Sequence, residues 1–526
     1  MSGVSRGRRR VLTALGTLGG TALGGCVSGA PVMSQAEHRP RFTHGIQAGT
    51  LTSQGGVLWA RADRPARLTV EIDTTPRFAR AIRLPPALAL PEHDLTARVA
   101  LPALPRGEQL CYRMRFESVA TRGAASPWET GRCATPKRST DDIRFLWGGD
   151  TAGQGYGIDP AHGGMRSYAA MLATEPDFFI HSGDTIYADG PIPADLTLPN
   201  GDRWQNLVSD GVDHVAQSLD DFRGRYRYNL RDTHLLAFNA AVPGYYHWDD
   251  HEVLNNHSPD TRLAEDERYH GVTLAQLKGR ARRAFAEMLP VPPSAGPANP
   301  QGLTRRVRYS DQLEVFSLDL RSFRAGNRPL EPAPADGHPL LGRAQFDWLL
   351  DGLKRSSARW KVIACSQPIG AVIADDFRTG AGMEGIASGT PGQPQYREAE
   401  VHRLLRALRE NRVRNLLWLT ADVHYAAAHH YDPERAAVDD FDPFWEFVAG
   451  PLHAGTFPAA PLDPTFGPRL DFYAGPEPGE GVNLPPSANK QYFGQVDLDG
   501  RTGVLTVSLK DRTGQKLYQR ELVPQA

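Results

Sequence analysis

The sequence predicts an α/β sandwich preceded by a small all-β sandwich, and two observations lead to this fold class. From residue 41 to residue 137, short alternating stretches are separated by Pro, Gly and Asp turns, a pattern typical of antiparallel sandwiches. From residue 141 onward, short apolar strands alternate with longer helical patterns, as in sheets whose faces are covered by helices. With 526 residues the chain is too long for one ordinary core, so two folding units are expected.

The first unit, residues 41–137, is expected to be a positioning module. Its strands are predicted at Gly56–Arg61, Arg67–Ile72, Thr96–Leu101 and Cys111–Glu117. It contains no cluster of His, Asp and Glu at ligand spacing, so the chemistry is expected downstream. Cys111 and Cys133 form either a disulfide or two buried thiols, and the sequence leaves both open.

The second unit, residues 141–526, alternates strands and helices. Apolar strands are predicted at Ile143–Trp147, Asp177–His181, Leu313–Leu318, Lys361–Ala364 and Leu416–Leu419. Helices are predicted at Ala161–Thr174, Leu274–Leu289, Arg343–Leu353 and Glu398–Asn411. Antiparallel strands are expected to close the sheet at Tyr492–Leu498, Thr502–Leu509 and Lys516–Leu522.

Residues 1–26 have the composition of an export signal. A cluster of arginines at positions 6, 8, 9 and 10 precedes an uncharged run, Val11–Gly25. Ser5–Thr13 resembles a twin-arginine signal, which implies the twin-arginine export machinery as a partner. An arginine-rich start to an ordinary secretory signal is the alternative. Both interpretations send the protein out of the cytoplasm, to the periplasm or the outer cell envelope.

Cys26 marks the end of this signal. Leu23-Gly24-Gly25-Cys26 resembles a bacterial lipobox, in which the cysteine is lipidated; the alternative is that Cys26 is discarded with a cleaved signal. No run of about 20 apolar residues follows, so a lipid on Cys26 is the one membrane attachment expected. Residues 27–40 are polar and aperiodic, which predicts a linker.

The charge balance excludes one class of partner. The 59 basic and 60 acidic side chains leave a formal net charge of −1. Such a chain has no general attraction for nucleic acids or anionic membrane surfaces, so no specific nucleic-acid recognition is expected. Selectivity for an anion must therefore arise locally.

Carboxylates follow three of the predicted strands. Asp150 comes after Ile143–Trp147, Asp184 after Asp177–His181, and Asp422 after Leu416–Leu419. In open α/β sheets the side chains just beyond the carboxyl ends of strands converge. Because clustered carboxylates repel one another and are costly to bury, this arrangement predicts a metal centre.

The run Tyr245–His257 is the densest set of metal-binding side chains in the sequence. It contains Asp250, His251 and Asn256 within seven positions. Carboxylate, amide and imidazole donors suit Ca²⁺, Mn²⁺, Fe or Zn²⁺, and the absence of a cysteine set argues against a thiolate site. Two or more ions are expected.

Three segments carry a family resemblance. Gly183–Asp189, Trp248–Val253 and Asp422–His424, in that order, resemble the PhoD-like alkaline phosphatases and phosphodiesterases. The resemblance spans roughly residues 41 to 520. It implies a four-layer calcineurin-like metallophosphatase domain preceded by a small immunoglobulin- or fibronectin-like β-sandwich.

The resemblance also implies a role for each matching residue. The implied metal ligands are Asp184 as the bridge, Tyr187 as a phenolate, Asp422, His424, Asp250 and Asn256. The implied catalytic residues are Asp184, His251 beside the scissile phosphate, and Arg321 or Arg324 in contact with phosphate.

The sequence departs from the family at the first strand end. Members that use iron and calcium carry a cysteine there, whereas this chain has Asp150. A ligand role for Asp150 survives because oxygen is a hard donor. Ca²⁺ with Fe³⁺ is what the resemblance implies, and Mn²⁺ or Zn²⁺ are the alternatives that this departure leaves open. Ala421 is a smaller departure, at a position where glycine usually precedes the final Asp-x-His motif.

Three functions fit these residues. The leading hypothesis is a phosphomonoesterase, an alkaline phosphatase that hydrolyses its substrate directly without a covalent enzyme intermediate. The alternatives are a phosphodiesterase or phospholipase D-like enzyme with the same metal centre, and a noncatalytic metal-binding lipoprotein. The loops at Gly190–Asp220 and Asp375–Gln395 are expected to decide between monoester and diester substrates.

The remaining candidates are interpreted as structural. His429 and His430 are expected to face a neighbouring strand or solvent, and Cys365 to be an inert core thiol. His453 stays undecided between a pocket and a turn. Gly153–Gly157 lacks the lysine of a nucleotide-binding loop and is expected to form a flexible rim.

Overall fold

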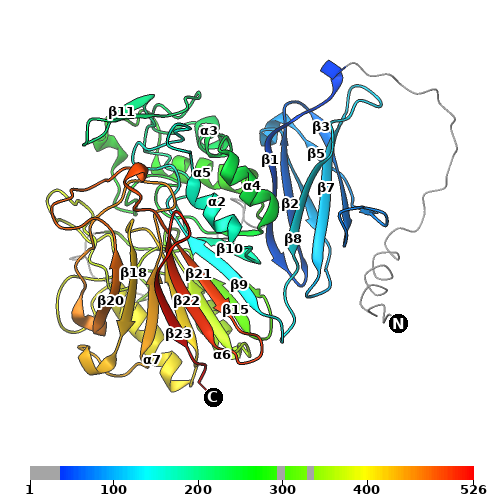
Figure 1. Ribbon diagram of the computed structural model, residues 1–526. Coiled ribbons are helices and arrows are strands. Elements are labelled where there is room, and N and C mark those ends of the chain that lie inside the picture. The colour runs from blue at the N-terminus through cyan, green and yellow to red at the C-terminus, as the bar shows by residue number, and fades with distance from the viewer. Residues whose placement is uncertain (1–35, 293–302, 328–336, 526) are drawn as a thin grey trace, which may run out of the picture.

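The computed structural model describes residues 36–292, 303–327 and 337–525. The predicted export signal, with Cys26, and the first part of the predicted linker lie outside these residues. Figure 1 shows the N-terminal strands, coloured blue, standing beside a larger region that runs from cyan to red. No helix among the described residues is long and apolar enough to cross a membrane.

The N-terminal region is a β-sandwich, as the sequence predicts. Its strands are β1 (Phe42–Thr52), β2 (Gly55–Ala62), β3 (Ala66–Asp73), β4 (Ile82–Arg83), β5 (Ala87–Ala89), β6 (Thr96–Leu101), β7 (Gln109–Ser118) and β8 (Glu129–Ala134). Strands β1, β2 and β6 form one face, and β3, β4, β5, β7 and β8 form the other. A core of aliphatic and aromatic side chains fills the space between the faces.

The two cysteines of this sandwich are free and buried. In the antiparallel pairing of β7 with β8, Cys111 lies opposite Arg132, while Cys133 lies opposite Leu110. A register offset of one residue points the two thiols to opposite faces of the sheet, so they cannot bond. Of the two alternatives that the sequence leaves open, the structure has the pair of buried thiols.

The N-terminal sandwich shares a sheet with the rest of the chain. Strand β1 pairs in parallel with β13 (Gly244–Tyr246) at Gly49 and Gly244, which joins both regions into one nine-stranded sheet. Glycine is required here, because a Cβ on Gly49 would lie 2.5 Å from the Pro290 carbonyl oxygen. The sheet therefore continues across the predicted boundary near residue 140.

The larger region has four layers. Its part of the nine-stranded sheet comprises β9 (Ile143–Gly148), β10 (Phe178–His181), β13, β21 (Tyr492–Leu498), β22 (Leu505–Asp511) and β23 (Lys516–Leu522). The seven-stranded sheet comprises β14 (Arg305–Arg308), β15 (Leu313–Ser317), β16 (Trp360–Ala364), β17 (Leu416–Thr420), β18 (Ala426–Tyr431), β19 (Phe444–Val448) and β20 (Pro468–Ala474). One apolar core lies between the two sheets.

Helices cover the outer faces of both sheets. The helices α2 (Arg166–Ala173), α3 (Leu219–Asn229), α4 (Thr233–Ala241) and α5 (Leu274–Met288) pack on the nine-stranded sheet. The helices α6 (Gly342–Arg355) and α7 (Arg397–Glu410) pack on the seven-stranded sheet. The order helix, sheet, sheet, helix is the predicted four-layer sandwich. A small two-stranded ribbon, β11 (Asp195–Thr197) and β12 (Arg203–Gln205), lies apart from the two large sheets.

The first predicted helix of this region starts later than expected. The segment before α2 contains Gly163 and Gly164, both with left-handed backbone angles. A Cβ on Gly164 would lie 2.3 Å from the Asp232 carboxylate, which in turn accepts a hydrogen bond from the Met165 backbone. The turn is thus held by a contact with a residue 67 positions away, which no local pattern reveals.

Candidate metal centre

The predicted ligands converge where parallel strands from both sheets end. Asp150 follows β9, Asp184 follows β10, Asp250 follows β13, and Asp422 and His424 follow β17. Their donor atoms form three overlapping groups, each within 4.8 Å: Asp150, Asp184 and His424; Asp184, Asp250 and His251; and Asp249, Asp250 and Asp422. Asp184 and Asp250 each belong to two groups, so the three groups form one continuous cluster.

The backbone of these ligands is unusual. Five of them have positive φ angles: Asp150 (69°), Asp184 (50°), Asn256 (55°), Asp422 (68°) and His424 (59°). Residues with a Cβ seldom adopt this left-handed conformation, and it persists only where the surrounding structure enforces it. Such strain concentrates at functional sites. Four of these five residues, all except Asn256, contribute donor atoms to the cluster.

The first group is completed by a tyrosine. The Tyr187 hydroxyl lies 2.8 Å from His424 Nε2, which lies 3.8 Å from Asp150 Oδ1. His424 Nδ1 is bonded to the Gly455 carbonyl oxygen, so Nε2 is the nitrogen that faces the cluster. Gly153 permits this packing, because a Cβ there would lie 2.3 Å from the Tyr187 ring. The Gly153–Gly157 segment therefore packs closely against a predicted ligand.

The second group surrounds His251. The His251 backbone donates to Asp184 Oδ1 at 3.2 Å and to Asp250 Oδ1 at 3.1 Å. Its side-chain Nδ1 lies 2.6 Å from Asp189 Oδ1. The Asn256 backbone donates to Asp250 Oδ2 at 2.6 Å, and its amide nitrogen donates to the Asp375 carbonyl oxygen. The loop that begins at Asp375 therefore reaches the edge of the site.

Arg321 is the centre of the third group. Its side chain is 0% exposed, with Nε bonded to Asp249 and Nη1 bonded to Glu384. Its Nη2 lies 3.5 Å from both Asp250 Oδ1 and Asp422 Oδ1. The family resemblance implies a phosphate contact for this arginine. In the structure, four carboxylates surround its guanidinium group. Arg324, the other candidate, bonds to Glu384 and is also buried.

Glu252 connects the loops that carry the ligands. It is fully buried, and its carboxylate accepts backbone hydrogen bonds from Asp184, Thr185 and Asp249. A carboxylate that accepts three backbone N–H groups holds those groups in one geometry. Glu252 lies inside the dense run recognised in the sequence, but no spacing rule identifies its partners.

Burial and mutual repulsion shift the proton affinities of the cluster. Burial, followed by neighbouring carboxylates, raises the pKa of Asp150, Asp184 and Asp422 well above the usual value. Burial also lowers the pKa of His424 to about 4. A bound cation would lower the pKa values of these carboxylates again, because it favours their charged form. The neutral imidazole of His424 is the form that binds metals.

His251 behaves in the opposite way. Burial disfavours its charged form, but the carboxylates of Asp189, Asp250 and Asp184 outweigh this and hold the pKa of His251 well above its usual value. Burial raises the pKa of Asp189, but the charge and hydrogen bond of His251 and the Asn255 backbone N–H outweigh it and lower this pKa. These carboxylates therefore favour the imidazolium form of His251, whose Nδ1 is engaged by Asp189.

The residues present fit a multinuclear metal centre. Asp150 Oδ2 is buried and has no hydrogen-bond partner among the described residues. Gly450 leaves room beside it, because a Cβ there would lie 2.2 Å from this oxygen. The donors are carboxylate, amide and phenol oxygens with one imidazole, which suits hard or borderline cations. All seven predicted ligands lie in or beside the cluster.

Other residues singled out in the sequence have structural partners. His429 Nδ1 bonds to Glu446, which also accepts from Tyr431. Cys365 is buried, and burial raises its pKa well above the usual value. The backbone of His453 pairs with Asp150 and Ala152, so it supports the Asp150 turn without offering its ring as a ligand.

The fold and the site together define a class of protein. Two packed sheets with carboxylates and histidines at the strand ends are the arrangement of metallophosphatases, enzymes that hydrolyse phosphoric esters with bound cations. The chain belongs to the PhoD-like phosphatase family: residues 145–509 match the model of the PhoD-like phosphatase, and residues 27–137 match that of its N-terminal domain. It is accordingly a phosphoric ester hydrolase, and the alternative of a noncatalytic metal-binding lipoprotein is wrong.

Known proteins agree with this assignment. Alkaline phosphatase D of Bacillus subtilis (strain 168) is 26% identical over 478 residues, covering 85% of this chain and 76% of that relative. A solved structure of PhoD superposes with a TM-score of 0.67 at 19% identity, over 94% of both chains. Purple acid phosphatase PPD1 from yellow lupin (Lupinus luteus) seeds superposes with a TM-score of 0.57 at 12% identity, over 92% of this chain and 74% of that one. Both structures confirm the predicted fold class.

Proposed function

We propose that this protein is an exported alkaline phosphatase that hydrolyses phosphate monoesters outside the cytoplasm. One observation carries the proposal: carboxylates and a histidine from the ends of four strands form a buried cluster in which Asp150 Oδ2 has no partner among the described residues. The name of the Bacillus relative supports the activity. The arginine cluster and apolar run of residues 1–26 support export.

The proposed ion sites divide the cluster in two. Asp150, Tyr187 and His424 would hold the first ion, and Asp250 and Asn256 the second. The family resemblance adds Asp422 to the first set, although its carboxylate lies nearest Asp249 and Asp250. Asp184 lies in both groups of donors and is the proposed bridge. Bound cations supply polarisation of the phosphoryl group and activation of a water molecule. We propose Ca²⁺ with Fe³⁺, and Mn²⁺ or Zn²⁺ as the alternatives that oxygen donors equally accept.

His251 is the proposed catalytic residue for the leaving group. Asp189 engages Nδ1 and stabilises the imidazolium, which leaves Nε2 for the substrate. A positively charged donor at this position stabilises negative charge on the leaving oxygen and provides its proton. Arg321 is proposed to hold Asp249, Asp250 and Asp422 in place instead of binding phosphate.

The preference for monoesters is tested by comparing two substrates. Purified enzyme is stripped of metal, refilled separately with Ca²⁺, Fe, Mn²⁺ or Zn²⁺, and assayed with a chromogenic phosphate monoester and with the corresponding bis-ester. We expect faster turnover of the monoester, and activity only after refilling. Faster turnover of the bis-ester would instead establish the phosphodiesterase alternative, and equal activity of the stripped enzyme would contradict the metal centre.

Export is tested separately. Replacing the arginines at positions 8 and 9 with lysine should retain the protein in the cytoplasm if the twin-arginine machinery carries it. Cys26→Ala should release the exported protein from the membrane fraction if the cysteine is lipidated. Unchanged export or unchanged fractionation would contradict the respective proposal.

A further inference from the structure

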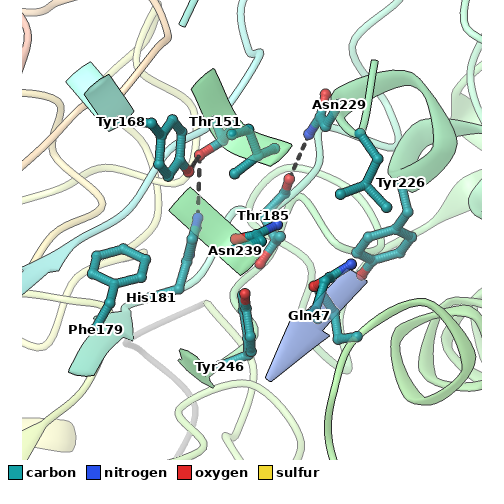
Figure 2. A pocket seen from close by; sticks show the side chains of 13 residues that line it. Gln47, Thr151, Tyr168, Phe179, His181, Thr185, Tyr226, Asn229, Asn239 and Tyr246 are labelled. Carbon is teal, nitrogen blue, oxygen red and sulfur yellow. Dashed lines mark hydrogen bonds between the residues drawn. The ribbon is translucent and has the colours of Figure 1, made fainter. Parts of the chain in front are cut away.

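A small chamber lies behind the candidate metal centre. It has a volume of about 30 Å³, and every residue that lines it is buried. Figure 2 shows Gln47 of β1, Tyr226 of α3, and Thr151 and Thr185 from the two strand-end turns among the side chains around it. The N-terminal sandwich thus contributes one wall of a chamber inside the phosphatase region.

Two residues that line the chamber directly follow candidate metal ligands in the sequence. Thr151 follows Asp150, and Thr185 follows Asp184. The Thr151 hydroxyl has protein partners, since it lies 2.9 Å from the Tyr168 hydroxyl and 3.1 Å from His181 Nε2. These bonds appear as dashed lines in Figure 2. The turn that carries Asp150 is therefore held by direct side-chain contacts.

The turn that carries Asp184 is held less completely. The Thr185 backbone N–H donates to Glu252, and its carbonyl oxygen accepts from Asn229 Nδ2 at 2.8 Å. Its hydroxyl, however, is buried and has no partner among the described residues. The same is true of the Tyr226 hydroxyl and of both amide atoms of Gln47, whose residue is only 1% exposed.

Buried polar groups in native proteins bind either protein atoms or ordered water. Four such atoms, with His181 Nδ1 as a fifth, surround one cavity and require a polar occupant, and none of them belongs to a carboxylate, ammonium or guanidinium group. A water molecule needs about 10–15 Å³ of such volume and two to four polar partners, so the chamber has room for about two waters. The uncharged lining and the small volume exclude an ion or an organic ligand.

We propose that the chamber holds about two ordered waters that link Gln47 of the N-terminal sandwich to the Thr185 hydroxyl, so that Gln47 is a positioning residue for Asp184. A direct hydrogen bond holds the strands of the sandwich near Gln47 against the phosphatase region. Gln47 pairs with Trp59 across β1 and β2, and the Trp59 indole donates to the Glu287 carbonyl oxygen of α5 at 2.7 Å. The inference rests on the proposed phosphatase function, because its catalytic readout is the turnover of a phosphoester.

The test uses Gln47→Leu, which removes both polar atoms at similar volume, and Thr185→Val, which removes the hydroxyl at similar shape. Each variant is expected to lower kcat about tenfold without changing KM for a chromogenic monoester, because the Asp184 carboxylate is displaced while substrate binding persists. The double variant is expected to lose no more than either single variant, because both changes break one water-mediated link. Thr185→Val alone carries the test if Gln47→Leu fails to fold.

Ile46→Val is the matched control. Ile46 precedes Gln47 on β1 and is equally buried, but it packs in the core of the N-terminal sandwich instead of lining the chamber. Ile46→Val removes one methyl group from this core, so it is expected to lower the melting temperature while kcat stays within about twofold of the wild type. A merely structural role for β1 would make the two variants alike.

Two readouts are independent of phosphoester turnover. A high-resolution crystal structure of the wild-type protein is expected to show waters within hydrogen-bond distance of Gln47 and Thr185, and the Gln47→Leu variant is expected to retain metal about tenfold less tightly. If the wild type hydrolyses no phosphoester, the proposed function fails. These two measurements still test whether waters in the chamber link Gln47 to Thr185 and affect the metal centre. A dry chamber, wild-type kcat and metal affinity in Gln47→Leu, or additive losses in the double variant would overturn the inference.

Discussion

Replacing Arg321 distinguishes two roles of this residue, holding the buried carboxylates in place or binding phosphate, because the first affects stability and the second affects KM. Its Nε and Nη1 bond to Asp249 and Glu384, and its Nη2 lies 3.5 Å from Asp250 and Asp422. Arg321→Met removes the positive charge from carboxylates that stay buried, and removal of one partner from a buried ion pair costs about 3–5 kcal/mol. For a region of this size, about 1–2 °C of melting temperature corresponds to 1 kcal/mol, so we expect a decrease of about 3–10 °C.

The assay is thermal unfolding of the metal-loaded enzyme, followed by measurement of kcat and KM. Arg321→Lys keeps the charge but lacks the planar fork that reaches Asp249 and Glu384 together, so it should lose about half as much stability. The control is Arg355→Lys, because the pair of Arg355 with Asp351 is largely exposed and contributes less than about 1 kcal/mol. If Arg321→Met melts with the wild type and only KM rises, Arg321 binds phosphate and the reasoning fails.

Four further predictions follow from the same contacts. Asp184→Ala should abolish turnover and reduce bound metal, whereas Asp220→Ala, at an exposed side chain, should do neither; full metal content in the first variant would contradict a bridging role. Glu252→Gln should lower metal affinity or activity about 10- to 100-fold, because an amide cannot accept all three backbone hydrogen bonds, and wild-type values would refute this. Chelation should lower the melting temperature by removing the cation that neutralises the carboxylate cluster, and refilling should restore it. At a free metal concentration of 100 times Kd, the bound metal is expected to stabilise the fold by about 2.7 kcal/mol; an unchanged melting temperature would argue against a resident metal. Burial raises the pKa of Glu398 to about 7 from 4.5, so its contribution to stability is full below pH 4.5 and is lost as the pH rises through 7; Glu398→Gln should flatten this part of the pH–stability profile, and an unchanged slope would exclude Glu398 as its source.

The strand ends were predictable because their signal is local. A short, largely apolar run with an aspartate three residues beyond its end identifies both a buried strand and the residue near its carboxyl end. The expected segments Thr96–Leu101 and Tyr492–Leu498 coincide with β6 and β21, and the expected Leu416–Leu419 differs from β17 by one residue. In these places the side-chain pattern alone specifies the conformation.

Other elements had weaker signals or none. Strand β18 is Ala-Ala-Ala-His-His-Tyr, a composition that does not favour strands, and it forms because β19 and β20 pair with it on both sides. Helix α3 had a signal that was overlooked, a capping box in which Ser218 and Asp221 satisfy each other's backbone N–H groups. The first of these depends on tertiary pairing, whereas the second could have been read from the sequence.

The partners of the site residues depend on contacts that span the chain. Glu384 lies in a loop without periodicity, yet it bonds to Arg321, 63 positions away. Ser366 donates to Asp249 across 117 positions, and Asp189 engages His251 across 62. Sequence spacing carries no information about such pairs, because loop closure over these lengths is determined by how the sheets pack.

The sequence by itself determined which candidate metal ligands follow the strand ends and in what order, because strand, turn and candidate ligand are encoded within a few consecutive residues. Only the tertiary structure decided what each charged group contacts. It placed the guanidinium of Arg321 against four carboxylates, and it joined β1 to β13 so that Gln47 lines a chamber behind Asp184. The reason is physical: a buried charge or polar atom takes the partner that packing brings within hydrogen-bond distance, and packing is a property of the whole chain.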